Sequence, residues 1–223
     1  MNTIKNLFKQ FYDWVKYETG SLDTVIFVLP AVIVITLTYW LIRRTWHKRK
    51  FGKDFKAKRR QCRLNETIRL LSVCWLSFIS TFVLMPYDFW WKFWKMAAYG
   101  KWEARPDPYS FDWNVKPLFV WLIADKYILS AGEAIHLLEN VALFVPFGLA
   151  LPFVRKRAGF FKTFLAGFIF AFVIELTQIF TGRGGDIDDL ICNTLGAVIG
   201  YLLYLLIQRL FPRFTEKCKT TAK

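Results

Sequence analysis

Cysteine is scarce in this 223-residue sequence, and its four cysteines show no spacing typical of a zinc site. Cys74 and Cys192 lie in apolar stretches, and Cys62 and Cys218 lie in basic stretches that we expect in the cytoplasm. The long segment expected outside the cell contains no cysteine, so we predict no disulfide bond. Internal repeats and low-complexity tracts are also absent, so no repeat architecture is expected.

Acidic residues are few, with 17 Asp and Glu against 31 Lys and Arg, which gives a formal net charge of +14. In a soluble protein such an excess would indicate binding to nucleic acid. Here the basic residues cluster in segments beside apolar stretches. That distribution is typical of the cytoplasmic loops of membrane proteins, where anionic inner-leaflet lipid adds to the bias. We therefore predict no nucleic-acid partner.

Apolar side chains are abundant, since 55% of the residues are hydrophobic and 19% are aromatic. Stretches of about 20 apolar residues recur along the chain, and each is long enough to cross a hydrocarbon core of roughly 30 Å. The sequence therefore predicts an all-α, polytopic membrane helix bundle with about five transmembrane helices and additional amphipathic or interfacial helices. The predicted spans cover residues 22–42, 67–85, 134–154, 163–181 and 187–210.

The charge distribution predicts the orientation of these spans. Residues 43–60 carry ten Lys and Arg opposed only by Asp54, so this segment should be cytoplasmic. Alternation then places the basic residues 155–157 and the basic tail on the same side. We expect the N-terminus outside the membrane and the C-terminus in the cytoplasm.

Three regions follow from this pattern. Residues 1–21 have apolar side chains at helical spacing and predict an amphipathic helix on the membrane surface, with partner binding as the alternative. Residues 22–66 hold the first span and the basic loop. Residues 67–223 form the main membrane domain, whose outer segment 87–133 contains an aromatic cluster suited to the headgroup zone. Within that segment, residues 117–124 are too short to span and predict an interfacial or re-entrant helix.

Polar side chains inside the last three spans are the candidate functional residues, because ionisable groups in a membrane are costly. By helical rise, Glu139, Asn140, Glu175 and Asn193 each lie roughly 10 Å below the outer ends of their spans. We therefore predict a polar cup that opens outward. Its residues are His136 and Asn140 in the third span, Glu175 and Gln178 in the fourth, Arg183 in the outer turn, and Asp186, Asp189 and Asn193 in the fifth.

Structural interpretations compete with this one. Asp186 is also typical of a helix N-cap, with Asp189 completing a capping-box-like pair. Asn140, Gln178 and Asn193 are equally compatible with hydrogen bonds between helices. Glu175 requires a partner, for which Arg183 and a divalent cation are the two candidates. Small residues continue the stripes inward, Gly167 and Ala171 on the fourth span and the GxxxG pair Gly196 and Gly200 on the fifth, and we expect these stripes to face each other.

The same residues resemble the VanZ-like family of bacterial membrane proteins. The matching motifs are Asn140-Val-Ala-Leu-Phe-Val-Pro-Phe-Gly148, Glu175-Leu-Thr-Gln178-Ile-Phe followed by Arg183, and Asp186-Ile-Asp-Asp189-Leu-Ile-Cys-Asn193-Thr-Leu-Gly196-Ala-Val-Ile-Gly200. The resemblance covers about residues 114–206, and the first span, basic loop and N-terminal helix lie outside it. It implies a role in the bacterial cell envelope and in low-level resistance to the lipoglycopeptide teicoplanin.

Three classes of function fit these features, beside a less favoured structural or regulatory role in which the basic loop contacts a partner protein. The first is a binder of an amphiphile, either a membrane lipid, a lipid-linked cell-wall precursor or a lipoglycopeptide. Its contacts would come from His136, Asn140, Gln178, Arg183 and Asn193. The second is an enzyme acting on a lipid headgroup, with Glu175, Asp186 and Asp189 as the catalytic or cation-binding acids. The third, a transporter, is less favoured because the polar residues stop about halfway across. The sequence identifies no metal, cofactor or oligomeric state.

Overall fold

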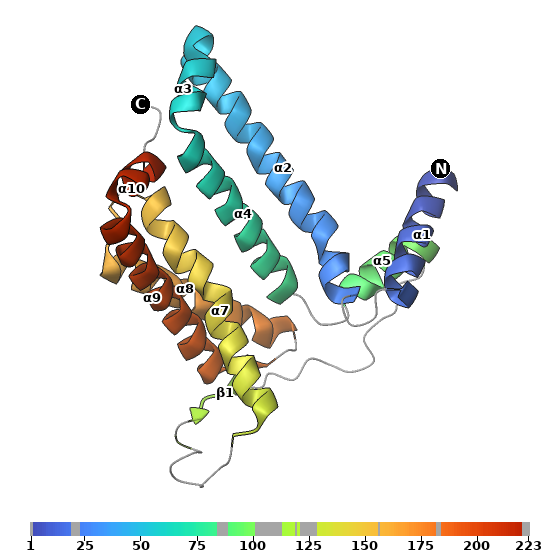
Figure 1. The fold of residues 1–223 in the computed structure, drawn as a ribbon. Helices are drawn as coiled ribbons and strands as arrows, with labels where there is room; N and C mark the ends of the chain where they lie inside the picture. The colour runs from blue at the N-terminus through green and yellow to red at the C-terminus, as the bar shows by residue number, and fades with distance from the viewer. Residues whose placement is uncertain are drawn as a thin grey trace.

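The computed structural model describes residues 2–18, 23–83, 89–100, 113–118, 120, 129–155, 157–181 and 184–219. Five helices in these ranges are long and apolar enough to cross a membrane. They are α2 (Asp23–Phe51), α4 (Arg63–Val83), α7 (Ala131–Val154), α8 (Phe160–Thr181) and α9 (Ile187–Leu210). The predicted all-α fold with five membrane-length helices is confirmed (Figure 1).

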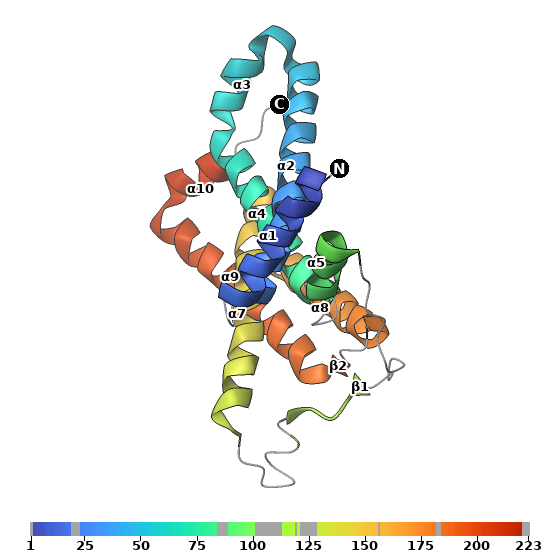
Figure 2. The ribbon, with the colours of Figure 1, turned by 90° about the vertical axis from the view of Figure 1, so that its right-hand side faces the viewer.

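Helix α2 continues beyond the predicted end of the first span, through the basic residues to Phe51. Lys and Arg are good helix formers, and cations in the last turn interact favourably with the helix dipole. The segment predicted as a basic loop is thus largely helical. It consists of the end of α2, the short 3-10 helix η2 (Gly52–Asp54) and the helix α3 (Phe55–Gln61). An ion pair of 2.5 Å between Arg43 Nη2 and Glu66 Oε1 holds α2 against α4, and Figure 2 shows the hairpin that results.

Helices α7 and α9 begin at the same end of the bundle and pack closely along their middle turns (Figure 1). A Cβ atom on Gly196 would lie 2.2 Å from the carbonyl oxygen of Val141, and one on Gly200 would lie 2.1 Å from that of Val145. Only glycine permits such an approach of two backbones. The GxxxG pair therefore contacts α7.

We expected the small residues of α8 and α9 to face each other. For Gly196 and Gly200 this expectation was wrong, because both contact α7. Helix α8 meets α9 through a different residue, since a Cβ atom on Gly167 would lie 2.5 Å from Cβ of Ala197. Beside this contact Ala171 and Ile174 of α8 and Phe144 of α7 are fully buried. The outward surfaces carry large apolar side chains, for example Phe161 (69% exposed), as expected of helices that face lipid.

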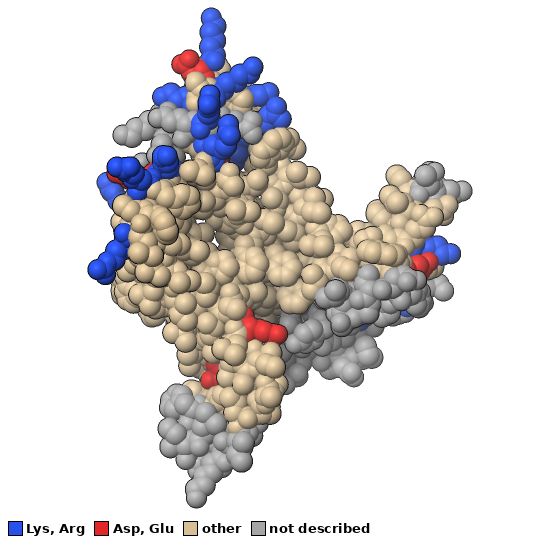
Figure 3. Space-filling model, viewed as in Figure 1, with Lys and Arg blue, Asp and Glu red and all other residues tan. Residues whose placement is uncertain are grey.

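The basic residues gather at one end of the molecule, around the α2–α4 hairpin and α10 (Pro212–Lys219), as Figure 3 shows. A buried polar network joins the helices there. Asn65 is fully buried, and its Nδ2 donates to the carbonyl oxygens of Phe153 (3.0 Å) and Cys218 (2.7 Å). Its Oδ1 accepts a 2.7 Å hydrogen bond from Nε of Arg69. One side chain thus links α4 to the ends of α7 and α10.

The predicted N-terminal helix is present as α1 (Asn2–Glu18), and it packs against α5 (Phe89–Tyr99) and the start of α2. Val15 is buried and Trp94 donates a 2.8 Å hydrogen bond to the carbonyl oxygen of Phe27. Ile4 and Leu7 on the same helix are exposed. The contact of α1 with the membrane surface stays a prediction, and so does the division of the chain into three regions. The interfacial helix expected at residues 117–124 also stays a prediction, because most of these residues lie outside the described ranges.

Candidate functional site

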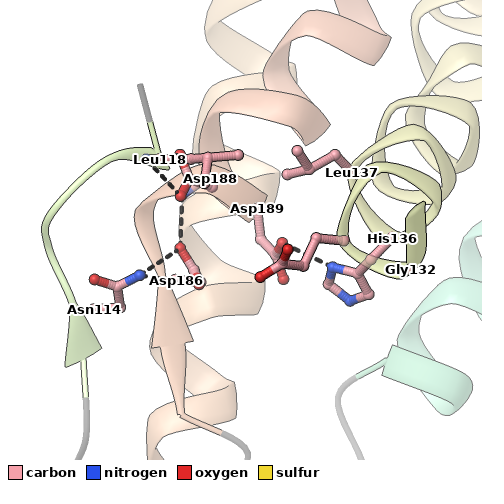
Figure 4. A pocket seen from close by; sticks show the side chains of 9 residues that line it. Asn114, Leu118, Gly132, His136, Leu137, Asp186, Asp188 and Asp189 are labelled. Atoms are coloured by element: carbon pink, nitrogen blue, oxygen red, sulfur yellow. Dashed lines mark hydrogen bonds and ion pairs between the residues drawn. The ribbon is translucent and has the colours of Figure 1, made fainter. Parts of the chain in front are cut away.

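A cavity of about 620 Å³ opens at the end of the bundle opposite the basic residues. It lies between the first turns of α7 and α9 and the two-residue strand β1 (Trp113–Asn114), as Figure 4 shows. Its lining residues are Asn114, Leu118, Gly132, Glu133, His136, Leu137, Asp186, Asp188 and Asp189. Four carboxylates surround this cavity, and no lysine or arginine in the described part of the chain lines it.

The first turn of α7 is fixed by a capping box. The Ser130 hydroxyl accepts the backbone N–H of Glu133 (3.3 Å), and the Glu133 carboxylate accepts that of Ser130 (2.8 Å). These contacts satisfy two of the N–H groups that a helix start leaves without partners. His136 follows within the next turn, so its position at the cavity is set by a defined helix start.

The start of α9 is held by a short parallel pairing that the sequence did not predict. Strand β1 pairs with β2 (Gly185–Asp186), with Asn114 opposite Asp186. Nδ2 of Asn114 lies 3.3 Å from Oδ2 of Asp186. Asp186 is the N-cap of α9, because its Oδ1 accepts the backbone N–H of Asp188 at 2.8 Å. The N-cap interpretation of Asp186 therefore holds, although its side chain also lines the cavity.

Asp188 is a cavity residue that the sequence analysis did not include among its candidates. Both of its carboxylate oxygens lie 2.9 Å from the backbone nitrogen of Leu118 (Figure 4). This contact brings the segment after β1 over the start of α9. In the sequence, only its position between Asp186 and Asp189 indicated that Asp188 lies at the site. Its contact with the backbone N–H of Leu118 could not be predicted, because a contact between residues far apart in the chain produces no local sequence pattern.

Asp189 is the residue on which the two helices converge. Its Oδ1 accepts a 2.5 Å hydrogen bond from Nδ2 of Asn140, and Nδ1 of His136 lies 3.7 Å from the same oxygen. His136 and Asn140 are one turn apart on α7, which is the spacing that places two side chains on one helix face. The structure thus brings together three of the predicted residues, and the neighbouring Glu139 is exposed.

Glu175 and Gln178 contact backbone groups behind the cavity and are not among its lining residues. Glu175 is 1% exposed, and its Oε2 accepts the backbone N–H of Asp186 at 2.9 Å. Nε2 of Gln178 donates a 3.3 Å hydrogen bond to the carbonyl oxygen of Val83 at the end of α4. These contacts tie α8 to the start of α9 and to α4, so both residues position the site.

Asn193 lies one turn below Asp189 on α9 and is 3% exposed. Its Oδ1 has no hydrogen-bond partner within the described ranges, and the residue does not line the cavity. Arg183 lies outside the described residues, so its expected pairing with Glu175 stays a prediction. Among the residues the structure describes, no three His, Cys, Asp or Glu side chains are grouped to hold a metal ion. The suggested cation set of Glu175, Asp186 and Asp189 is therefore not assembled.

Five membrane-length helices and a carboxylate-lined cavity at one end define a polytopic membrane protein with a polar terminal site. The sequence model of the VanZ/LLP1 family matches residues 27–208, and the chain belongs to this family. The matched range includes most of the first span and the basic hairpin. The resemblance seen in the sequence motifs covered only about residues 114–206, so that range was too short.

A curated relative, Protein VanZ of Enterococcus faecium, is 36% identical to this chain over 76 residues. That alignment covers 34% of this chain and 47% of the relative, so the chain spans about half the length of the curated relative it matches. No solved structure matches the chain.

Proposed function

We propose that this protein acts in the bacterial cell membrane and lowers sensitivity to lipoglycopeptides such as teicoplanin. Membership of the VanZ/LLP1 family and similarity to Protein VanZ of Enterococcus faecium support this role. The mode of action we propose is binding of an amphiphile in the carboxylate-lined cavity.

The orientation follows from the charges. Lys and Arg gather around α3 and α10, and cytoplasmic segments of membrane proteins are enriched in these residues. This end therefore faces the cytoplasm, with the C-terminus inside and the N-terminus outside. The cavity at the opposite end then opens at the outer leaflet, where cell-wall precursors and lipoglycopeptides are found.

The observation that carries the proposal is the meeting of His136 and Asp189 at the mouth of a bundle whose outer surfaces are apolar. A ligand head could enter the cavity while its hydrocarbon tail stays in lipid along the helices. Acceptor groups dominate the lining, so the head should present amines or hydroxyls as donors. Leu118 and Leu137 add apolar contacts beside them. A lipoglycopeptide and a lipid-linked cell-wall precursor are the ligand classes we favour.

A second candidate function, catalysis on a lipid headgroup, depends on one pair of residues. Asp189 beside His136 is an arrangement found where a carboxylate orients a general base. Glu175 and Asp186, the other two candidate acids, accept backbone N–H groups. Transport receives less support, because backbone contacts at Gly196 and Gly200 close the space between α7 and α9 below the cavity.

Drug sensitivity of a teicoplanin-sensitive bacterium that expresses the chain tests the proposal. The unmodified protein should raise the minimum inhibitory concentration of teicoplanin but not that of a glycopeptide without an acyl tail. Asp189→Ala and His136→Ala should each abolish most of that increase, because they remove the two groups that meet at the cavity. Arg183→Ala belongs in the same series, as a predicted contact residue.

Glu139→Ala is the matched control, since Glu139 is an exposed acid on the same helix and does not line the cavity. It should retain the full increase in inhibitory concentration at equal membrane abundance, measured by immunoblot. Unchanged resistance in both Asp189→Ala and His136→Ala would remove the cavity from the mechanism.

A further inference from the structure

A second charged cavity lies at the basic end, between the end of α7 and the start of α8, with a volume of about 410 Å³. Arg155, Arg157 and Lys162 surround it, and Phe147 and Leu151 of α7 line its apolar side. The three cationic side chains form no ion pair or hydrogen bond with any part of the chain that the structure describes. No acidic residue of the described ranges lines this cavity.

The start of α8 adds to the positive potential of this cavity. Its first turn contains Lys162 and no acidic residue, and the position before it is Gly159, which has no side chain to accept an N–H group. Free N–H groups and the helix dipole make the N-terminus of a helix attractive to anions. A cation in the first turn is unfavourable for the helix unless a negative charge lies nearby.

An apolar cavity of about 430 Å³ lies on α7 near the charged one, between α4, α7, the last turns of α9 and α10. The same two residues, Phe147 and Leu151, line both cavities. The apolar cavity extends from Ile68, near the start of α4, to Trp75 in the middle of that helix and Pro146 of α7. Its length thus follows the direction in which a lipid chain enters a membrane from the headgroup zone.

We propose that these two cavities, which meet at Phe147 and Leu151, together bind one anionic phospholipid of the leaflet that faces the basic end. Its phosphate lies among Arg155, Arg157 and Lys162, and one acyl chain passes Phe147 and Leu151 into the apolar cavity. The three cations favour a ligand with a negatively charged headgroup. The nearby apolar cavity favours a ligand that also has an acyl chain, and therefore a lipid over a soluble phosphate. This site is separate from the carboxylate-lined cavity and does not depend on its function.

Native mass spectrometry of the full chain in detergent tests the proposal with phosphatidylglycerol and phosphatidylcholine of identical acyl chains. We expect the unmodified protein to retain one phosphatidylglycerol more tightly than phosphatidylcholine. Replacement of the three cations together (Arg155→Gln, Arg157→Gln and Lys162→Gln) should weaken phosphatidylglycerol binding by about tenfold or more. Ala150→Trp should weaken it as well, because Ala150 lines the apolar cavity and a larger side chain fills the space for the acyl chain.

The matched control removes three exposed cations from the other basic segment at the same end, by Lys48→Gln, Arg49→Gln and Lys53→Gln. This control should keep the phosphatidylglycerol preference. Equal losses in both triple variants, or no loss in either, would overturn the proposal, as would displacement of the lipid by equimolar glycerol phosphate. A photoactivatable phosphatidylglycerol on the unmodified protein gives a test without substitutions. Its crosslinks should map to residues 146–166 and to α4, and crosslinks confined to other regions would contradict the site.

Discussion

Nδ2 of Asn140 donates a 2.5 Å hydrogen bond to Oδ1 of Asp189, and this bond joins the polar portions of α7 and α9. Asp189 lies in the first turn of α9, whereas Asn140 lies more than two turns into α7, so the two helices are offset along their axes. The carboxylate that faces the cavity is thereby held by a residue below it. Helix packing and the shape of the candidate site are therefore coupled through one contact.

A double-mutant cycle should detect this coupling. Asn140→Ala and Asp189→Ala each remove the same hydrogen bond, so the double variant should lose less stability than the two single variants added together. Interhelical hydrogen bonds in membranes contribute about 0.6 kcal/mol, up to about 1.7 kcal/mol. The free energy of unfolding in mixed detergent micelles measures the effect. A cycle of Glu139→Ala with Asp189→Ala is the control and should be additive.

The membrane helices could be predicted because the length of an apolar run is a local property. Each of the five runs found in the sequence is a helix in the structure. The sequence also placed His136, Asn140 and Asp189 in one polar group near the same helix ends, and the structure brings these three side chains together. Helical rise alone did not give their pairing, because it matched the depth of Asn140 with that of Asn193, whereas the structure places Asn140 beside Asp189.

The direction in which each side chain points could not be predicted in the same way. The rotation of a helix about its axis depends on all the helices around it. Glu175 and Gln178 have the expected depth but contact backbone groups of Asp186 and Val83. The β1–β2 pairing involves two residues per strand, which is too few for a periodic pattern. These contacts, and that of Asp188, arise only when the tertiary structure forms.

Replacement of Glu175 should separate a structural role from a chemical one. Glu175→Ala removes a buried acceptor of the Asp186 N–H and leaves a cavity, so we expect a loss of about 2–4 kcal/mol in the free energy of unfolding. Glu175→Gln keeps an oxygen acceptor of similar size and should cost about 1 kcal/mol or less. Detergent unfolding followed by tryptophan fluorescence measures both.

The drug-resistance phenotype of the same two variants adds a second measurement. If Glu175 only positions α9, Glu175→Gln should retain most of the resistance. Loss of resistance in Glu175→Gln at unchanged stability would instead indicate that the carboxylate takes part in chemistry, and would favour the enzymatic alternative. Equal destabilisation by Gln and Ala would show that the negative charge matters more than the acceptor oxygen.

The close contact of α7 and α9 predicts strong effects of small substitutions. A Cβ atom on Gly148 would lie 1.9 Å from the carbonyl oxygen of Ala197, so Gly148→Ala must push the two backbones apart. We expect a loss of about 2–3 kcal/mol in stability, as in other overpacked interiors. Gly159→Ala is the control, because a Cβ atom on Gly159 would have no described atom within 4 Å. A stable Gly148→Ala variant would mean that α7 and α9 are not in backbone contact in the membrane.

Asn65 predicts a specific change at the basic end. Its amide donates to the carbonyl oxygen of Cys218, and Asn65→Ala should therefore release α10 from the bundle. Burial raises the pKa of the Cys218 thiol above its ordinary value, so at neutral pH the folded protein holds the unreactive thiol form. Release of α10 should lower that pKa again and increase the thiolate fraction.

Maleimide labelling of a variant in which Cys218 is the only cysteine measures this change. Labelling of the folded protein should be slow at neutral pH and accelerate as the pH rises toward the raised pKa of Cys218. Asn65→Ala should increase the neutral-pH rate by about tenfold or more, through both the exposure and the pKa of the thiol. Thr67→Ala is the control on the same helix, since Thr67 is exposed and its hydroxyl donates to the carbonyl oxygen of Arg63, one turn earlier in that helix. Equal labelling rates in all three proteins would show that Asn65 does not hold α10 in place.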